Sequence, residues 1–350
     1  MGSRAGVKRE PLVSVMLPAR DAADTLQSAA ESCLQQTWAD LEILLIANDS
    51  TPGTLAVMND LAGADRRVRI LHSPPRAGFI TALNLGWYQA RGRFLARMDA
   101  DDFSYPDRIA RQVQCLNDNA ELAACGSHVR IIRRGRDGEH LPPLQGFADY
   151  EKWLNSLTTP QSIAAQRFID SPLSNPSAMI RKEAMKQLGG YRVVDWAEDY
   201  DFWLRMIEAG LQVGIVPEVL LDWFDSELRM TRNDDHYSQR RFLQAKAHFL
   251  GRLAVVRDLG VGICGAGPIG KRLARLLKKQ GVRIAAFYDV NDRRIGNVIL
   301  GRPVLGATAM PPSGQQVLIG AVGVSGARDL IRERVAPLGY EEGQDFFCVA

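Results

Sequence analysis

Three carboxylates stand close together at the end of Arg93–Asp102, where Asp99, Asp101 and Asp102 follow an apolar run that is fit for a buried strand. Open α/β sheets bind ligands at the carboxyl ends of their strands. Crowded like charges cost Coulomb energy unless a cation offsets them, and hard ions such as Mg²⁺ or Mn²⁺ take carboxylate and phosphate oxygens. The pattern therefore predicts a metal and phosphate site. The alternative is a solvated acidic turn that caps the helix after Pro106.

A second pair of carboxylates, Glu198 and Asp199, stands directly before an amphipathic stretch. A carboxylate at the entrance of a helix can accept the proton of an attacking hydroxyl, as a general base does. The alternative is that these acids only favour the amino terminus of a helix through its dipole. Among the residues that follow, Phe202, Leu204, Met206 and Ile207 are expected in the core rather than in an acceptor platform, and His236 is a further candidate near the site.

A glycine-bearing unit begins at Leu259. Gly265, Gly267 and Gly270 follow a short apolar run with the spacing G-x-G-x-x-G and open a helix over 268–279, and Asp289 ends the next strand, which is expected over 282–288. This context fits a dinucleotide site, in which a tight turn and a helix amino terminus receive the pyrophosphate and an acid binds a ribose hydroxyl. The alternative is a structural or assembly module, because the remaining chain has no room for a separate hydride-acceptor domain.

The positions of the apolar residues predict the elements that carry the first of these groups. Strands are expected over 12–18, 41–47, 68–71 and 93–98, and helices over 26–34, from Thr54 and over 76–90. Polar residues follow the first two strands at their carboxyl ends. The repeated β-α-β order implies a parallel sheet that is covered on both faces.

Four motifs follow one another in this region: Pro18–Asp21, Asn48-Asp49-Ser50, Gly78 to Gly92, and Met98–Asp102. Their order and spacing resemble the nucleotide-sugar half of family-two inverting glycosyltransferases with the GT-A fold. The resemblance implies a donor nucleoside, by family habit that of UDP, bordered by Pro18, Arg20, Asp21 and Asp49. It also implies an Mn²⁺ or Mg²⁺ ion held against the donor diphosphate by Asp101 with Asp99 or Asp102. Where the family usually has two aspartates and a glycine, Asn48-Asp49-Ser50 stands, so the base contact rests on Asp49.

The acceptor half of the resemblance lies in Ser171–Ser177, Leu188–Arg192 and Trp196–Arg205. It implies that Glu198 and Asp199 are the catalytic acidic dyad of the family, with Asp199 as the base. In many relatives a histidine stands at the place of Asn175, so its role does not carry over. The segment Trp223–Ser238 resembles one that closes over the site, where Arg229 or Arg232 could meet the diphosphate.

The length of 350 residues predicts two domains. The predicted fold class is α/β, with a GT-A nucleotide-sugar-binding domain over 1–225, in which helices flank a mostly parallel sheet. A helical connector follows over 226–256. A small C-terminal Rossmann-like domain over 257–350 resembles the domains appended to sugar-modifying transferases and acyltransferases.

Composition excludes several classes of function. A net charge of +3 is too small to predict a nucleic-acid partner. No stretch approaches 18 uninterrupted apolar residues and no signal-peptide core stands at the amino terminus, so we expect a cytoplasmic protein. Basic clusters at Arg130–Arg136 and Lys278-Lys279 are candidates for peripheral contact with anionic lipid at the inner face of the membrane, or are simply solvated. The five cysteines lack metal-ligand spacing, which argues against zinc and disulfides.

Two functions compete for this chain. One is a metal-dependent inverting glycosyltransferase of the hexosyltransferase type, which moves a sugar from a UDP-sugar to a glycan or lipid-linked acceptor in surface polysaccharide biosynthesis. The other is a nucleotide-binding oxidoreductase or sensor organised around Gly265–Gly270. The amino-terminal two thirds carries a metal pair, nucleotide loops and a base in transferase order, whereas the carboxyl-terminal third has no evident hydride-transfer dyad. We therefore predict the transferase.

Overall fold

The computed structural model describes residues 13–135, 139–225 and 234–350, and these form two compact units. The first unit takes the described residues of Met1–Pro160, Leu173–Val193 and Arg205–Arg229. The second takes those of Gln161–Pro172, Val194–Leu204 and Met230–Ala350. The units are described separately below. The domain boundaries at 225 and 256 stay a prediction, because compactness does not show where a domain folds independently.

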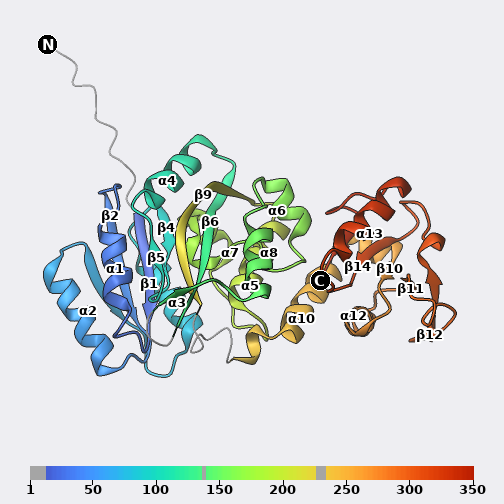
Figure 1. The fold of residues 1–350 in the computed structure, drawn as a ribbon. Coiled ribbons are helices and arrows are strands. Elements are labelled where there is room, and N and C mark those ends of the chain that lie inside the picture. Colours follow the sequence, from blue (N-terminus) through green and yellow to red (C-terminus); the bar gives the residue numbers. More distant parts are fainter. Residues whose placement is uncertain (1–12, 136–138, 226–233) are drawn as a thin grey trace, which may run out of the picture. The chain divides into compact units, whose positions relative to one another are not determined.

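The first unit begins with strands and helices in alternation. Its elements are β1 (Val13–Ala19), α1 (Leu26–Leu34), β2 (Leu41–Ala47), α2 (Pro52–Ala64), β3 (Val68–His72), α3 (Phe79–Gln89) and β4 (Phe94–Arg97). The four strands pair in parallel in the order β3-β2-β1-β4 (Figure 1). Every residue of β1 and β2 is buried, as expected for a parallel sheet that is covered on both faces. This half of the sheet confirms the predicted β-α-β order.

Helix α3 packs very closely against the sheet at Gly86. A Cβ atom at this position would lie 2.5 Å from Cδ1 of Ile46 and 3.5 Å from Sδ of Met16, so a larger residue would require the Ile46 side chain to move. On the other face, Val13, Val15 and Leu17 share one hydrophobic core with α1 and α2. Both faces of β1 are thus held, which fixes the place where its carboxyl end emerges.

Beyond β4 the sheet is mixed. The remaining elements are β5 (Phe103–Ser104), α4 (Arg108–Asp118), β6 (Leu122–Arg134), β7 (His140–Leu141), α5 (Gln145–Leu154), the 3-10 helix η1 (Asn175–Ser177), β8 (Met179–Arg181), α7 (Lys182–Leu188) and β9 (Gln212–Asp225). The order continues as β4-β8-β6-β9-β5, with β8 antiparallel to both of its neighbours and β6 parallel to β9. Strand β5 returns the chain from the triad turn to the sheet by pairing with β9.

The second unit holds a separate sheet. Its elements are α6 (Pro160–Gln166), the first part of α8 (Glu198–Glu208), η2 (Asp235–Tyr237), α10 (Gln239–Leu250), α11 (Ala254–Leu259), β10 (Val261–Cys264), α12 (Pro268–Lys279), β11 (Ile284–Asp289), β12 (Val298–Ile299), β13 (Arg302–Gly306), η3 (Ala307–Ala309), β14 (Val317–Gly320), α13 (Ala327–Val335), η4 (Ala336–Leu338) and β15 (Phe346–Cys348). The order is β12-β13-β11-β10-β14-β15, and only the β12–β13 pair is antiparallel. The parallel strands are therefore arranged third, second, first, fourth and fifth, which is the order of a doubly wound sheet with its ligand crevice beside the first strand.

Two features bear on the predicted contact with lipid. None of the described helices is both long and apolar enough to cross a bilayer. In the cluster Arg130–Arg136, the guanidinium of Arg130 donates to Asp222 at 2.8 and 2.7 Å, and that of Arg134 lies 4.3 Å from the ring centroid of Phe224. Arg136 lies outside the described residues. Arg130 and Arg134 thus have partners within the protein, and lipid contact stays a prediction.

Candidate active site

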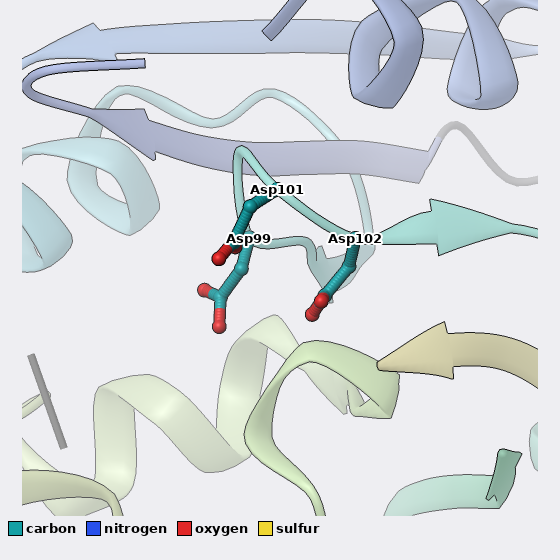
Figure 2. A group of neighbouring side chains, drawn as sticks. All are labelled: Asp99, Asp101 and Asp102. Atoms are coloured by element: carbon teal, nitrogen blue, oxygen red, sulfur yellow. The ribbon is translucent and has the colours of Figure 1, made fainter. Parts of the chain in front are cut away.

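The three predicted metal ligands come together in the turn after β4. One carboxylate oxygen from each of Asp99, Asp101 and Asp102 lies within 4.8 Å of the other two. Figure 2 shows the three side chains projecting to the same side of the turn. Asp99 and Asp101 are partly exposed, whereas Asp102 is buried. The turn therefore presents a convergent set of oxygen ligands, as the sequence predicted.

Asp99 is held by an arginine that the sequence analysis gave no role. Arg97 is 1% exposed, and its Nη2 donates to Oδ1 of Asp99 at 2.6 Å. Its Nη1 donates to the backbone carbonyls of Met16 and Met98 at 3.2 and 3.0 Å. A buried charge-assisted hydrogen bond of this kind fixes the geometry of both partners. The sequence signal is an arginine inside an apolar strand, two residues before an acid.

Asp102 links the triad to another strand. It is 2% exposed, and its Oδ1 accepts a hydrogen bond from the backbone N–H of Phe224 in β9 at 2.9 Å. Helix α4 has Asp107 at its N-cap position, without a hydrogen bond from that side chain to the helix. The alternative of a solvated acidic turn that caps this helix therefore does not describe Asp102.

The donor atoms of the triad suit a hard divalent ion. Mg²⁺ binds oxygens at about 2.1 Å, so two ligands on opposite sides of one ion lie about 4 Å apart. The 4.8 Å limit on the oxygens of the triad means that small side-chain movements would bring them into such a shell. Mg²⁺ and Mn²⁺ also prefer carboxylate oxygens as ligands, whereas zinc sites are usually built from nitrogen and sulfur ligands. The residues present therefore fit the predicted ion.

The four predicted nucleoside residues lie on two neighbouring loops. Pro18 is in β1, Arg20 and Asp21 follow that strand, and Asp49 follows β2. Ser50 ties the loops together, because its hydroxyl donates to the carbonyl of Ala19 at 2.7 Å. Since β1 lies between β2 and β4 in a parallel array, these loops emerge at the same sheet edge as the triad.

Asp49, Arg20 and Asp21 are the accessible members of this group. Asp49 is exposed and has the left-handed backbone angle φ of 50°, and its Oδ1 accepts a hydrogen bond from the backbone N–H of Arg76 at 3.0 Å. Arg20 and Asp21 are both 64% exposed, with Nε and Oδ2 3.9 Å apart. A pair this exposed contributes little to stability, so both side chains remain available to a ligand.

The acidic dyad begins α8. Glu198 is 6% exposed and accepts a hydrogen bond from the hydroxyl of Tyr237 at 2.9 Å, on its Oε2. Asp199 is partly exposed, and its Oδ1 accepts from the N–H of Tyr200 at 2.7 Å. Phe202, Leu204 and Met206 are buried, as predicted, whereas Ile207 is only partly buried. Arg229 and Arg232 lie outside the described residues.

The three glycines of the G-x-G-x-x-G motif, which lies in the second unit, have three different surroundings. Gly265 has a φ of +113°, and a Cβ there would lie 2.6 Å from Val322. A Cβ on Gly270 would lie 2.0 Å from the carbonyl oxygen of Gly265, so only glycine lets α12 pack on β10. At Gly267 the nearest such atom is Nη1 of Arg294, at 3.7 Å. The backbone at Gly267 therefore has the open side that a phosphate needs.

A surface pocket of about 450 Å³ lies over this turn. Its lining residues are Ala266, Gly267, Pro268, Lys271, Arg272, Arg275 and Arg294. Asp289 is buried beside it and accepts hydrogen bonds from the N–H groups of Asn291 and Ala266 and from Arg294, at 2.9, 2.8 and 3.1 Å. Burial alone would raise the pKa of Asp289, but these hydrogen bonds outweigh it and hold the pKa below its ordinary value. The pocket is thus strongly basic, with a single ionised acid at its edge.

Comparison with known proteins decides the family. A sequence profile described as glycosyl transferase family 2 matches residues 14–189, which is half of the chain. The chain belongs to glycosyl transferase family 2. The matched residues contain the nucleoside loops and the triad, so the resemblance inferred from the motifs is confirmed at the level of the family.

Two relatives of this family 2 chain are each matched over part of their own length. An uncharacterized glycosyltransferase of Haemophilus influenzae is 30% identical over 217 residues, which cover 61% of this chain and 65% of the relative. The hyaluronan synthase of Pasteurella multocida is 39% identical over 205 residues, which cover 58% of this chain and 19% of the synthase. The alignment thus spans less than two thirds of each relative's own length.

Solved structures confirm the predicted GT-A fold class. The mannosyltransferase PcManGT from Pyrobaculum calidifontis, in complex with GDP-Man and Mn²⁺, has a TM-score of 0.52 at 19% identity and covers 77% of this chain and 69% of its own. TarS residues 1–349 of S. aureus, in complex with UDP-GlcNAc, has a TM-score of 0.52 at 13% identity and covers 69% and 67%. At these identities the likeness concerns the fold alone.

Proposed function

We propose that this family 2 chain is a metal-dependent inverting glycosyltransferase that moves a sugar from a nucleotide diphosphate donor to a glycan or lipid-linked acceptor. The observation that carries the proposal is the triad within 4.8 Å at the carboxyl end of β4, beside the loops after β1 and β2. We propose UDP as the nucleotide from the motif resemblance. The names of the hyaluronan and chondroitin synthases among its relatives support a place in surface polysaccharide biosynthesis. We place the reaction in the cytoplasm, at the inner face of the membrane.

The residues of the first unit would bind and orient the donor. Asp49 and Arg20 would border the nucleoside, while Arg97 keeps the Asp99 carboxylate in one orientation. Asp101, with Asp99 or Asp102, would hold Mn²⁺ or Mg²⁺, which when bound neutralises the charge that develops on the diphosphate leaving group. The hydrogen bond from the backbone N–H of Phe224 would hold the Asp102 carboxylate in one orientation.

The acidic dyad would supply the base. In a single displacement, the acceptor oxygen forms a bond to the anomeric carbon as the bond from that carbon to the diphosphate oxygen breaks. The configuration at the anomeric carbon inverts, and the electron pair of the broken bond leaves with the nucleoside diphosphate. The Asp199 carboxylate would accept the proton that the acceptor hydroxyl loses. Its partial exposure supports this assignment, because a base must reach a proton on a bound ligand.

The donor part of the proposal is tested by calorimetric titration of the full chain with UDP, GDP and CMP, in Mn²⁺ and in EDTA. We expect UDP to bind in Mn²⁺ and to lose most of its affinity in EDTA. Equal affinity in both buffers would exclude the metal, and binding of GDP in place of UDP would correct the nucleotide.

We also propose that Gly265, Gly267, Gly270 and Asp289 form a second, separate site for a phosphate-bearing ligand, with no redox chemistry. The supporting observations are the open side of Gly267 and the four basic side chains of the pocket over α12. Unpaired amides at a helix amino terminus favour phosphate. Titration of the full chain with NAD, NADP and UDP tests the site, and reduction of a nicotinamide by the protein would overturn the transferase assignment.

A further inference from the structure

We infer that Tyr237 is a positioning residue of the acidic dyad, which fixes the orientation of the Glu198 carboxylate beside Asp199. The inference rests on the proposed function. It starts from a contact that no motif predicts: the Tyr237 hydroxyl lies 2.9 Å from Oε2 of Glu198, although the two residues are 39 positions apart.

The direction of this hydrogen bond is fixed by chemistry. A phenol has one proton to give, and an ionised carboxylate can only accept. Burial, followed by the nearby carboxylates of Glu198 and Asp199, raises the pKa of Tyr237 far above its ordinary value, so the phenol stays protonated over the whole physiological range. Tyr237 is therefore a permanent donor to Glu198. A hydrogen bond donated to an ionised carboxylate is charge-assisted, so it fixes the orientation of the Glu198 side chain.

The segment that carries Tyr237 is anchored on both sides. Before it, Oδ1 of Asp234 accepts from the N–H of His236 at 3.0 Å and lies 2.8 Å from the Nδ1 atom of that ring. After it, the hydroxyl of Ser238 caps α10 through the N–H of Arg241. His236, the residue that the sequence singled out here, is thus turned to Asp234, and its neighbour Tyr237 contacts the dyad.

Helix α10 is in turn packed on the start of α8. The rings of Phe242 and Tyr200 are stacked with centroids 4.9 Å apart, and those of His248 and Trp196 are 5.3 Å apart. Tyr200 and Trp196 flank the dyad in sequence. The elements that carry Tyr237 and Glu198 are thus already in contact with each other. Little further conformational entropy is therefore lost when the phenol and the carboxylate form their hydrogen bond.

The test is Tyr237→Phe in the full chain, with kcat and KM measured for a donor that the wild type uses. We expect kcat to fall about 10- to 100-fold, as for the loss of a hydrogen bond to a charged group, with KM for the donor unchanged. Tyr340→Phe is the matched control, because it removes the hydroxyl of another buried tyrosine, which donates to the backbone carbonyl of Pro312 at 3.4 Å. It should leave kcat unchanged.

A double-mutant cycle separates positioning from general damage. If Tyr237 acts through Glu198, Tyr237→Phe should cost less than about twofold in kcat in a Glu198→Gln background. The inference would be overturned if the losses in kcat from Tyr237→Phe and Glu198→Gln were fully additive, or if Tyr237→Phe had the wild-type kcat. Neither result would affect the proposed function, which the activity of the wild type supports. A wild-type chain that transfers sugar from no nucleotide donor would instead overturn the proposed function.

Discussion

Removing one charge from the triad should have opposite effects on ligand binding and on folding. Two unit charges at the 4.8 Å limit repel by about 1 kcal/mol in water and about 3.5 kcal/mol at an effective dielectric constant of about 20. Asp101 has two such neighbours, of which Asp99 is offset by Arg97. Because Asp101 is partly exposed, solvent screening favours the lower value. In the absence of divalent ions, Asp101→Asn should therefore stabilise the protein by about 1 kcal/mol, which raises Tm by about 2–4 °C.

The assay is calorimetric melting in EDTA, in Mn²⁺ and in Mn²⁺ with UDP. The wild type should melt at higher temperature in Mn²⁺ and higher still with UDP, since a ligand that binds only the folded state stabilises it. Asp101→Asn should start higher in EDTA and gain nothing from either addition. Asp60→Asn, which removes an exposed charge from α2, should keep the wild-type response. An Asp101→Asn protein that melts lower in EDTA and retains the Mn²⁺ shift would refute the reasoning.

Three further predictions concern the second unit. Asp199→Asn should lower turnover about 10²–10⁴-fold with little change in donor binding. If Asp199→Asn instead keeps the wild-type turnover and Glu198→Gln shows this loss, Glu198 is the base. Gly267→Val should abolish the binding of a phosphate-bearing ligand at α12, because the open side of Gly267 faces the pocket. It should spare Mn²⁺-dependent UDP binding, since the φ of −81° at Gly267 suits valine and the fold should be kept. Calorimetric titration with both ligands tests this. Burial lowers the pKa of Lys246 to about 8. Above that pH the unfolded chain binds more protons than the folded chain. The free energy of unfolding should therefore rise by about 1 kcal/mol from about pH 8 to about pH 9. Denaturant titrations should show this rise for the wild type and not for Lys246→Met.

The parts of the fold that the sequence predicts are those with local causes. Strands β1, β2 and β4 are buried along their whole length, so each is a mostly apolar run that is followed by polar residues. Helix α12 carries its own start signal and an amphipathic pattern, and its observed bounds, Pro268–Lys279, are those predicted. By contrast, β5 has two residues and β8 has three, which is too short for a pattern to show. Their places are set by pairing with distant strands.

The same distinction holds for the site. Asp99, Asp101 and Asp102 are neighbours in the chain, so their convergence follows from one turn. The role of Arg97 depends on carbonyls of β1, and that of Tyr237 depends on a contact across 39 positions. Arg97 stands out in the sequence as an arginine two residues before an acid, but no local pattern encodes its contact with β1 or that of Tyr237 with Glu198. These two residues therefore had to come from the structure.

The central claim is that this family 2 chain transfers sugar with inversion in a metal-dependent reaction. The most direct measurement is proton NMR of the product formed from an α-linked UDP-sugar with a glycan acceptor, in Mn²⁺ and in EDTA. The account predicts a β-configured anomeric proton in the product, formed in Mn²⁺ and abolished by EDTA. An α-configured product, or one that forms equally well in EDTA, would contradict it.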